Sequence, residues 1–172
     1  RVASEVLSQP QIDDDLVVVQ SIDGKVAAYD AIDGSRKWVY TTNIPSLTLR
    51  GTATPIISGD VILVGFSSGR VALLERETGF SGLDYRVGVA QGDSDLERLV
   101  DIDGAMAMEN GRLYAASFQG RIIGLDIASG RILWSEEASS VSGVGTGFGN
   151  VYLASSDSQI SAYNADNGRE VW

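Results

Sequence analysis

Side chains suited to binding another protein occur in two separate segments of the chain. The segment SLTLRG contributes Leu47, Leu49 and Arg50. The segment DLERLVDIDG contributes Asp101 and Asp103. Leucines that lose their water on binding, an arginine that donates two parallel hydrogen bonds and carboxylates that accept them are typical of protein–protein interfaces. The alternation in LTLR has a second interpretation, an additional strand whose leucines pack against the edge of a sheet.

Residues for catalysis or metal binding are scarce. The chain contains no cysteine and no histidine, which excludes thiol nucleophiles, disulfides, Ser-His-Asp triads and His or Cys zinc sites within these residues. Asp93, Asp95, Asp101 and Asp103 could be calcium ligands, but the glycine and closing glutamate of an EF-hand are absent. We therefore expect solvated acidic loops, no metal site and no catalytic residue. Paired carboxylates for hydrolysis stay an open alternative, because acidic residues are too frequent here to select any pair.

Composition sets the class of protein and the partners it can attract. The 172 residues are 44% hydrophobic, which is enough to bury one sizeable core. The net charge of −10 repels a phosphate backbone or an anionic lipid surface, so we expect no nucleic acid partner. No apolar run approaches the roughly 20 residues that span a bilayer.

An internal repeat organises the whole chain. Four segments align without gaps, and each reads as strand, turn and strand: GKVAAYDAIDGSRKW (24–38), GRVALLERETGFSGL (69–83), GRIIGLDIASGRILW (120–134) and SQISAYNADNGREVW (158–172). Each turn contains a glycine four positions after an acidic or amide residue, at Gly34, Gly79, Gly130 and Gly168. Glycine tolerates the positive φ of a tight turn. Two more short strands precede each segment, as in LVVVQS before the first.

Four short strands per repeat, with no helical period, predict an all-β fold: a β-propeller of four-stranded antiparallel blades. We expect blades at approximately residues 7–40, 52–85, 104–136 and 142–172. A blade cannot bury both of its faces alone, so neighbouring blades must stack. The residues that close the repeats are expected to provide inter-blade packing: Trp38, Leu83, Trp134 and Trp172.

The connectors between blades carry the variation in repeat length. Connectors 38–55 and 83–106 are both longer than connector 134–144. Connectors of one kind emerge at one end of a propeller, so we expect the two long ones to be neighbours and to bring SLTLRG beside DLERLVDIDG. Within the second, SDLE at 94–97 fits a capping box and predicts a short helical turn.

Two resemblances follow from these features. The strand–turn–strand unit with its Asp, Gly and Trp resembles the tryptophan-docking repeat of the quinoprotein-like β-propellers. SLTLRG followed by DLERLVDIDG is similar to the BamB family, the lipoprotein propellers of the outer-membrane β-barrel assembly (BAM) machinery of Gram-negative bacteria. One departure is DGAM at 103–106, where a proline-containing stretch is more typical of the family.

The resemblance implies an eight-bladed propeller, so a chain with four repeats is expected to be a fragment of it. It also implies a non-enzymatic scaffold without cofactor at the periplasmic face of the outer membrane, held there by a lipid anchor outside this sequence. The implied partner is a periplasmic POTRA domain of BamA, with unfolded outer-membrane proteins as a further candidate. The residues expected to contact BamA are Leu47, Leu49, Arg50, Asp101 and Asp103, together with Arg98.

Two other functions stay open. The first is a quinoprotein dehydrogenase that uses pyrroloquinoline quinone and calcium. The chain lacks the cysteine pair that such enzymes often place over the cofactor, and no residue group matches their calcium site, although missing blades could supply both. The second is a propeller that binds a peptide or sugar at its central channel. The fold permits it, but no particular residue favours it.

Overall fold

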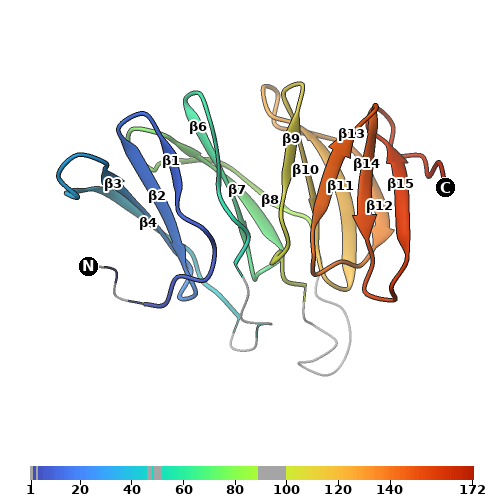
Figure 1. Ribbon diagram of the computed structural model, residues 1–172, viewed down its shortest axis with the longest axis horizontal. Coiled ribbons are helices and arrows are strands. Elements are labelled where there is room, and N and C mark those ends of the chain that lie inside the picture. The colour runs from blue at the N-terminus through green and yellow to red at the C-terminus, as the bar shows by residue number, and fades with distance from the viewer. Residues whose placement is uncertain (1, 3, 46–47, 49–51, 89–99) are drawn as a thin grey trace.

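The computed structural model describes residues 2, 4–45, 48, 52–88 and 100–172. Within these ranges all regular secondary structure is β-strand, arranged as four antiparallel sheets that stand side by side in chain order (Figure 1). Each sheet is one blade, and the first and fourth blades lie at opposite ends of the row. The all-β propeller fold predicted from the sequence is confirmed.

Consecutive strands pair with each other in every blade. Blade 1 contains β1 (Gln11–Asp13), β2 (Leu16–Ser21), β3 (Lys25–Asp30) and β4 (Arg36–Thr41). Blade 2 contains β5 (Ile56–Ser58), β6 (Val61–Phe66), β7 (Arg70–Glu75) and β8 (Ser81–Arg86). Blade 3 contains β9 (Ala107–Glu109), β10 (Arg112–Ala116), β11 (Gly120–Asp126) and β12 (Arg131–Ala138). Blade 4 contains β13 (Val144–Gly147), β14 (Asn150–Ala154) and β15 (Ile160–Asn164).

The fourth strand of blade 4 begins in the last described residues. Glu170 forms an isolated antiparallel bridge with Tyr163 on β15. The backbone N–H of Val171 donates to the carbonyl of Ala162 (2.7 Å), and the N–H of Ala162 donates to the carbonyl of Trp172 (2.8 Å). Residues 170–172 therefore follow the path that β4, β8 and β12 take in the other blades.

The core lies between blades, because the middle strands are apolar on both faces. Neighbouring residues of a strand point to opposite sides of a sheet. On β6, Ile62 therefore packs against blade 1 while Leu63 packs against blade 3, and both are fully buried. The same alternation builds a third cluster between blades 3 and 4 around Tyr114, Trp134 and Tyr163.

The two ends of the blades differ in the segments they carry. The first strands of neighbouring blades lie close together, since β1 contacts β5 and β9 contacts β13. Because each blade is an antiparallel meander, the turns after its first and third strands share one end, which we call the turn end. The turn after its second strand shares the other end with the connectors to the next blade, which we call the connector end.

The turns after the third strands repeat one geometry in all four blades. The glycines at 34, 79, 130 and 168 have φ between +65° and +72°. The N–H of each donates to the carbonyl four residues earlier, at 2.8–3.0 Å. This positive φ is the reason for the glycine in each repeat, as the sequence predicted. Among the residues that the structure describes, none belongs to a helix long and apolar enough to cross a membrane.

Candidate partner-binding face

Tryptophans at the turn end join neighbouring blades. Trp38 is 8% exposed, and its Nε1–H donates to the carbonyl of Arg76 in blade 2 (2.8 Å). Its ring lies so close to Gly79 that a Cβ there would come within 2.4 Å of it. Trp134 repeats the arrangement with a bond to the carbonyl of Ala165 (2.9 Å) and a ring that covers Gly168. Each of these joints combines apolar burial with one directional hydrogen bond.

Leucine replaces tryptophan between blades 2 and 3. Leu83 lies against Gly130 of blade 3 at the position that a ring takes in the other joints. A leucine has no side-chain donor, and the hydroxyl of Tyr85 instead donates to the carbonyl of Gly130. Trp172 is 62% exposed, and its ring centroid lies 6.2 Å from that of Tyr152 in its own blade.

Ion pairs reinforce two of these joints. Arg76 pairs with Asp13 of blade 1, and its Nη2 also donates to the Asp13 carbonyl (3.0 Å). The hydrogen bond from this guanidinium to Asp13 raises the pKa of Arg76. Arg112 pairs with Asp166 across the boundary between blades 3 and 4. The turn end therefore holds the blades together.

The first long connector is fixed to the connector end at both of its ends. It leaves blade 1 where the N–H of Thr42 donates to the carbonyl of Gly24 in the β2–β3 turn (3.0 Å). A Cβ on Gly24 would come within 2.7 Å of Ile44, so the connector runs directly over this glycine. The connector returns at Ala53, which is fully buried.

The second long connector is fixed to the turn between β6 and β7. On leaving blade 2, the N–H groups of Val87 and Gly88 both donate to the carbonyl of Gly69 (2.8 and 3.1 Å). On returning, Val100 packs against Gly69 and Gly88. The N–H of Ile102 then donates to the carbonyl of Phe66 (3.2 Å).

The returning ends of the two long connectors meet over one glycine of β6. A Cβ on Gly65 would lie 2.7 Å from Ile102 and 3.1 Å from Ala53. The carbonyl of Gly65 accepts a hydrogen bond from the buried amide of Gln20 in blade 1 (2.8 Å). Ile102 is fully buried in the core between blades 2 and 3. The structure therefore brings the returning ends of both connectors, Ala53 and Ile102, onto one site at the connector end. We call these two ends the connector roots.

The predicted contact residues divide between described and undescribed parts of the chain. Asp101 is 1% exposed, and its backbone carbonyl accepts a hydrogen bond from the N–H of Phe118 (2.9 Å). Asp103 is partly buried in the next part of the same segment. The others lie outside the described residues, as does the helical turn predicted at 94–97: Leu47, Leu49, Arg50 and Arg98.

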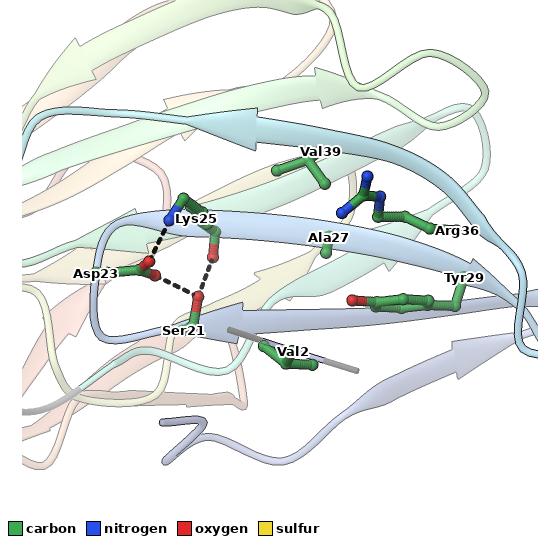
Figure 2. A pocket seen from close by; sticks show the side chains of 8 residues that line it. All are labelled: Val2, Ser21, Asp23, Lys25, Ala27, Tyr29, Arg36 and Val39. Atoms are coloured by element: carbon green, nitrogen blue, oxygen red, sulfur yellow. Dashed lines mark hydrogen bonds and ion pairs between the residues drawn. The ribbon is translucent and has the colours of Figure 1, made fainter. Parts of the chain in front are cut away.

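Charged groups near the connector roots are paired within their own blades. Figure 2 shows Asp23 at the β2–β3 turn, where it accepts hydrogen bonds from Lys25 and from the Ser21 hydroxyl (2.6 Å). Burial raises the pKa of Asp23, but these hydrogen bonds outweigh burial and leave the pKa below its usual value. In blade 2, Arg70 donates to Asp84 (2.8 Å), which raises the pKa of Arg70. The Asp23 carboxylate is therefore ionised at neutral pH.

Acidic side chains do not form a metal centre in the part of the chain that the structure describes. Across residues 4–45, 52–88 and 100–172, no three His, Cys, Asp or Glu side chains gather in a way that could hold a metal ion. Asp93 and Asp95, which the sequence offered as calcium ligands, lie outside the described residues. At the connector end, the described geometry is that of two connectors whose returning ends pack on the blades at Gly65.

Sequence reasoning missed the residues that fix the two roots. Gln20 is a buried polar residue that follows the apolar run LVVV of β2, and Gly65 interrupts the apolar strand VILVGF. A glycine inside a strand often marks a close approach of another segment, and a buried amide needs a hydrogen-bond partner. Both signals were present in the sequence. Neither signal identifies which segment packs on Gly65 or which group bonds to Gln20.

Comparison with known sequences gives a consistent result over the whole chain. Residues 1–172 match the family described as outer membrane protein assembly factor BamB. A protein of that name from Pseudomonas aeruginosa is 42% identical over 131 residues, which are 76% of this chain and 34% of the relative. Another from Yersinia pestis is 33% identical over 171 residues, 99% of this chain and 44% of the relative. The chain thus spans less than half the length of these relatives.

Comparison with solved structures agrees. The crystal structure of BamB from Moraxella catarrhalis superposes with a TM-score of 0.93 at 32% identity, covering 99% of this chain and 52% of that one. A quinohemoprotein alcohol dehydrogenase from Comamonas testosteroni gives a TM-score of 0.79 at 15% identity, covering 98% of this chain and 34% of that one, and so shares the fold alone. The repeat, the blades and these matches together show that the chain belongs to the BamB family of outer membrane protein assembly factors.

Proposed function

We propose that this chain is part of a non-enzymatic scaffold subunit of the outer-membrane protein assembly machinery. In this proposal its connector end binds the periplasmic POTRA region of BamA, and the subunit assists the insertion of β-barrel proteins from the periplasmic face of the outer membrane. Family membership supports the assembly role. The choice of face rests on the chain's own residues.

The observation that carries the proposal is the meeting of two connector roots over Gly65. Ala53 and Ile102 are both buried there, so each connector is held at its base. A binding loop that is fixed at its base loses less conformational entropy on association than a free one. The two connectors held in this way are the ones that contain SLTLRG and DLERLVDIDG.

The proposed contact residues have distinct roles. Leu47 and Leu49 supply apolar anchors, and Arg50 supplies a forked donor for a carboxylate or backbone oxygen. Arg98 adds a second cation from the other connector. Asp103 accepts hydrogen bonds from the partner. Asp101, which is buried, contributes by holding the segment in place through the bond between its carbonyl and Phe118.

Calorimetric titration of this chain with the purified POTRA region of BamA tests the proposal. Arg50→Glu reverses the charge of a proposed interface anchor, so affinity should fall by at least about 2 kcal/mol, more than roughly thirtyfold. Arg131→Glu is the matched control, because Arg131 is exposed where β12 leaves the turn end. It should bind like the unsubstituted chain.

A second pair of variants tests the apolar anchors. Leu49→Ser should also weaken binding, whereas Ile132→Ser, at an exposed aliphatic residue of β12, should not. Circular dichroism and thermal unfolding establish that all four variants stay folded. Unchanged affinity for both Arg50→Glu and Leu49→Ser would overturn the assignment of this face.

A further inference from the structure

Two arginines lie directly opposite each other at the connector end of blade 2. Arg70 begins β7, Arg86 ends β8, and the two are register partners in the sheet. We call them the arginine pair. Building on the proposed function, on which this inference rests, we propose that the arginine pair binds a carboxylate of the POTRA region and makes the partner-binding face selective for an acidic group.

The residue opposite the cation distinguishes blade 2 from its neighbours. Blades 1 and 3 also carry a cation at the repeat position of Arg70, but Lys25 lies opposite Thr41 and Arg121 lies opposite Glu137. In blade 2 the cation lies opposite a second cation. Like charges at directly opposite positions destabilise a sheet, because their Cβ atoms are only about 5 Å apart. The stability of blade 2 therefore does not explain the second arginine, which points to a role in contact with another molecule.

One carboxylate offsets half of the charge of the arginine pair. Arg70 Nε donates to Asp84 Oδ1 at 2.8 Å, and the two side chains are 33% and 30% exposed. Arg86 is exposed, and its side chain forms no ion pair or hydrogen bond with the residues that the structure describes. Two guanidinium groups and one carboxylate leave a net charge of +1 at this site, in a chain whose net charge is −10. A second carboxylate, supplied by the partner, would complete the local charge balance.

The arginine pair faces blade 1, close to the point where the first long connector begins. Ala72 packs in the core between blades 1 and 2, and Arg70 lies two residues before it, so both side chains are on the same face of the sheet. Arg86 shares that face because it is directly opposite Arg70. Tyr40 of blade 1 interacts electrostatically with Arg70, and the connector leaves blade 1 two residues later, at Thr42.

The second long connector begins at the same site. Val87, whose N–H donates to the Gly69 carbonyl, follows Arg86 directly. The arginine pair therefore lies between the starting points of the two connectors that we propose contact the partner. A guanidinium binds a carboxylate through two parallel hydrogen bonds, which adds geometric selectivity to the charge. We assign a protein carboxylate and not a lipid phosphate, because the net charge of −10 repels an anionic membrane surface.

Calorimetric titration of the full 172-residue chain with the POTRA region tests the arginine pair. Arg86→Gln removes one charge-assisted hydrogen bond and should raise the dissociation constant about tenfold. Binding of the unsubstituted chain should weaken with added salt, and binding of Arg86→Gln should depend on salt less steeply. Arg131→Gln is the matched control, since it removes the same charge from an exposed residue at the turn end and should leave affinity unchanged.

Asp84→Asn should act in the opposite direction. This variant removes the carboxylate that already occupies Arg70, so both guanidinium groups become available to the partner. Affinity for the POTRA region should rise roughly two- to fivefold, the range expected for one partly exposed ion pair. Circular dichroism and thermal unfolding establish that Asp84→Asn and Arg86→Gln stay folded. A loss of affinity in folded Asp84→Asn would contradict the proposed charge balance.

Arg86→Lys identifies the partner carboxylate. A carbodiimide joins an amine to a carboxylate in direct contact with it, so the amine introduced at position 86 should be cross-linked to an aspartate or glutamate of the POTRA region. Peptide mass spectrometry locates the bond. Arg131→Lys should give no such product. Cross-links from position 86 only to carboxylates of this chain would overturn the inference.

Comparison with Arg50→Glu separates this inference from the proposed function. If Arg50→Glu weakens binding and Arg86→Gln does not, the connector end stays assigned and the arginine pair is overturned. If the POTRA region does not bind the unsubstituted chain, both are overturned. Binding to phosphatidylglycerol vesicles that Arg86→Gln abolishes, with affinity for the POTRA region unchanged, would overturn the protein carboxylate in favour of an anionic lipid.

Discussion

The turn end and the connector end of the blades differ in how regular their segments are. At the turn end, four turns share one backbone geometry, and the tryptophan joints repeat between blades. At the connector end, three connectors of different length leave the blades, and two of them return to the same glycine. Regular segments hold the blades together, and the irregular ones are those that we propose contact a partner.

This contrast shows where a repeat protein can change. Each turn-end glycine is covered by a side chain of the preceding blade wherever that blade is present, so a change there affects two blades at once. The contacts described for the two long connectors lie at the ends where they leave and rejoin the blades. Loops on the surface tolerate sequence change better than the strands they connect. Substitutions at the two ends should therefore have different consequences.

The strongest effect on stability is expected from Trp134→Ala at the turn end. Removing this ring leaves a cavity over Gly168 and deletes one donor to the Ala165 carbonyl, which should lower the free energy of unfolding by about 3–5 kcal/mol. Urea unfolding followed by circular dichroism measures the change. Trp134→Phe keeps most of the packing and should cost about 1 kcal/mol. Equal losses for the two variants would show that the hydrogen bond and not the ring dominates.

Gly65→Ala tests the connector roots. Its Cβ would come within 2.7 Å of Ile102, so both connectors must shift, at a cost of about 1–3 kcal/mol. Affinity for the POTRA region should fall as well. The control is Gly82→Ala, where the described residues leave a Cβ unobstructed within 4 Å. If Gly65→Ala lost stability but bound the POTRA region normally, the roots would not position the binding loops.

The ion pair between Arg76 and Asp13 should contribute less. The side chains are 12% and 47% exposed, so a double-mutant cycle with alanine should give a coupling of about 0.5–1 kcal/mol that falls with added salt. The pair of Arg112 and Asp166 is more exposed and should couple more weakly. The reverse order would mean that exposure does not determine the strength of these cross-blade contacts.

The smallest effect concerns acid titration of a turn. The Ser129 hydroxyl and backbone N–H donate to Asp126 and lower the pKa of this carboxyl below 3.8. Its contribution to stability is therefore present above about pH 3.8 and is lost as the pH falls through the lower, folded-state pKa. In Ser129→Ala the pKa should rise towards 3.8, measured by carbon-detected NMR. The pKa of Asp33, which the hydrogen bond from the Ser35 N–H lowers, should not change in that variant.

Much of the fold was predictable because it depends on local patterns that recur. The acidic or amide residue and the glycine at 34, 79, 130 and 168 encode a turn within each repeat, and β-branched runs encode strands buried on both faces. The contacts over Gly65 were not predictable. They join Gln20, Ala53 and Ile102 from three distant segments, and no local pattern specifies such a meeting.

The burial of individual site residues could not be predicted from the sequence either. Asp101 reads as an accessible acceptor in an acidic loop, yet it is 1% exposed in the structure. Leu83 aligns with three tryptophans, but only the structure shows that the Tyr85 hydroxyl supplies a donor to the next blade at that joint. Whether one residue can supply the hydrogen bond that its neighbour lacks depends on side-chain geometry, which a repeat alignment does not contain.

Hydrogen exchange with mass spectrometry, with and without the POTRA region of BamA, tests most directly whether the partner binds at the connector end and not at the turn end. Bound partner should slow exchange of amides in the connectors 42–55 and 87–106. Exchange in the turns 31–35, 76–80, 127–130 and 165–168 should stay unchanged. Protection confined to those turns, with the connectors unaffected, would contradict the assignment of binding to the connector end.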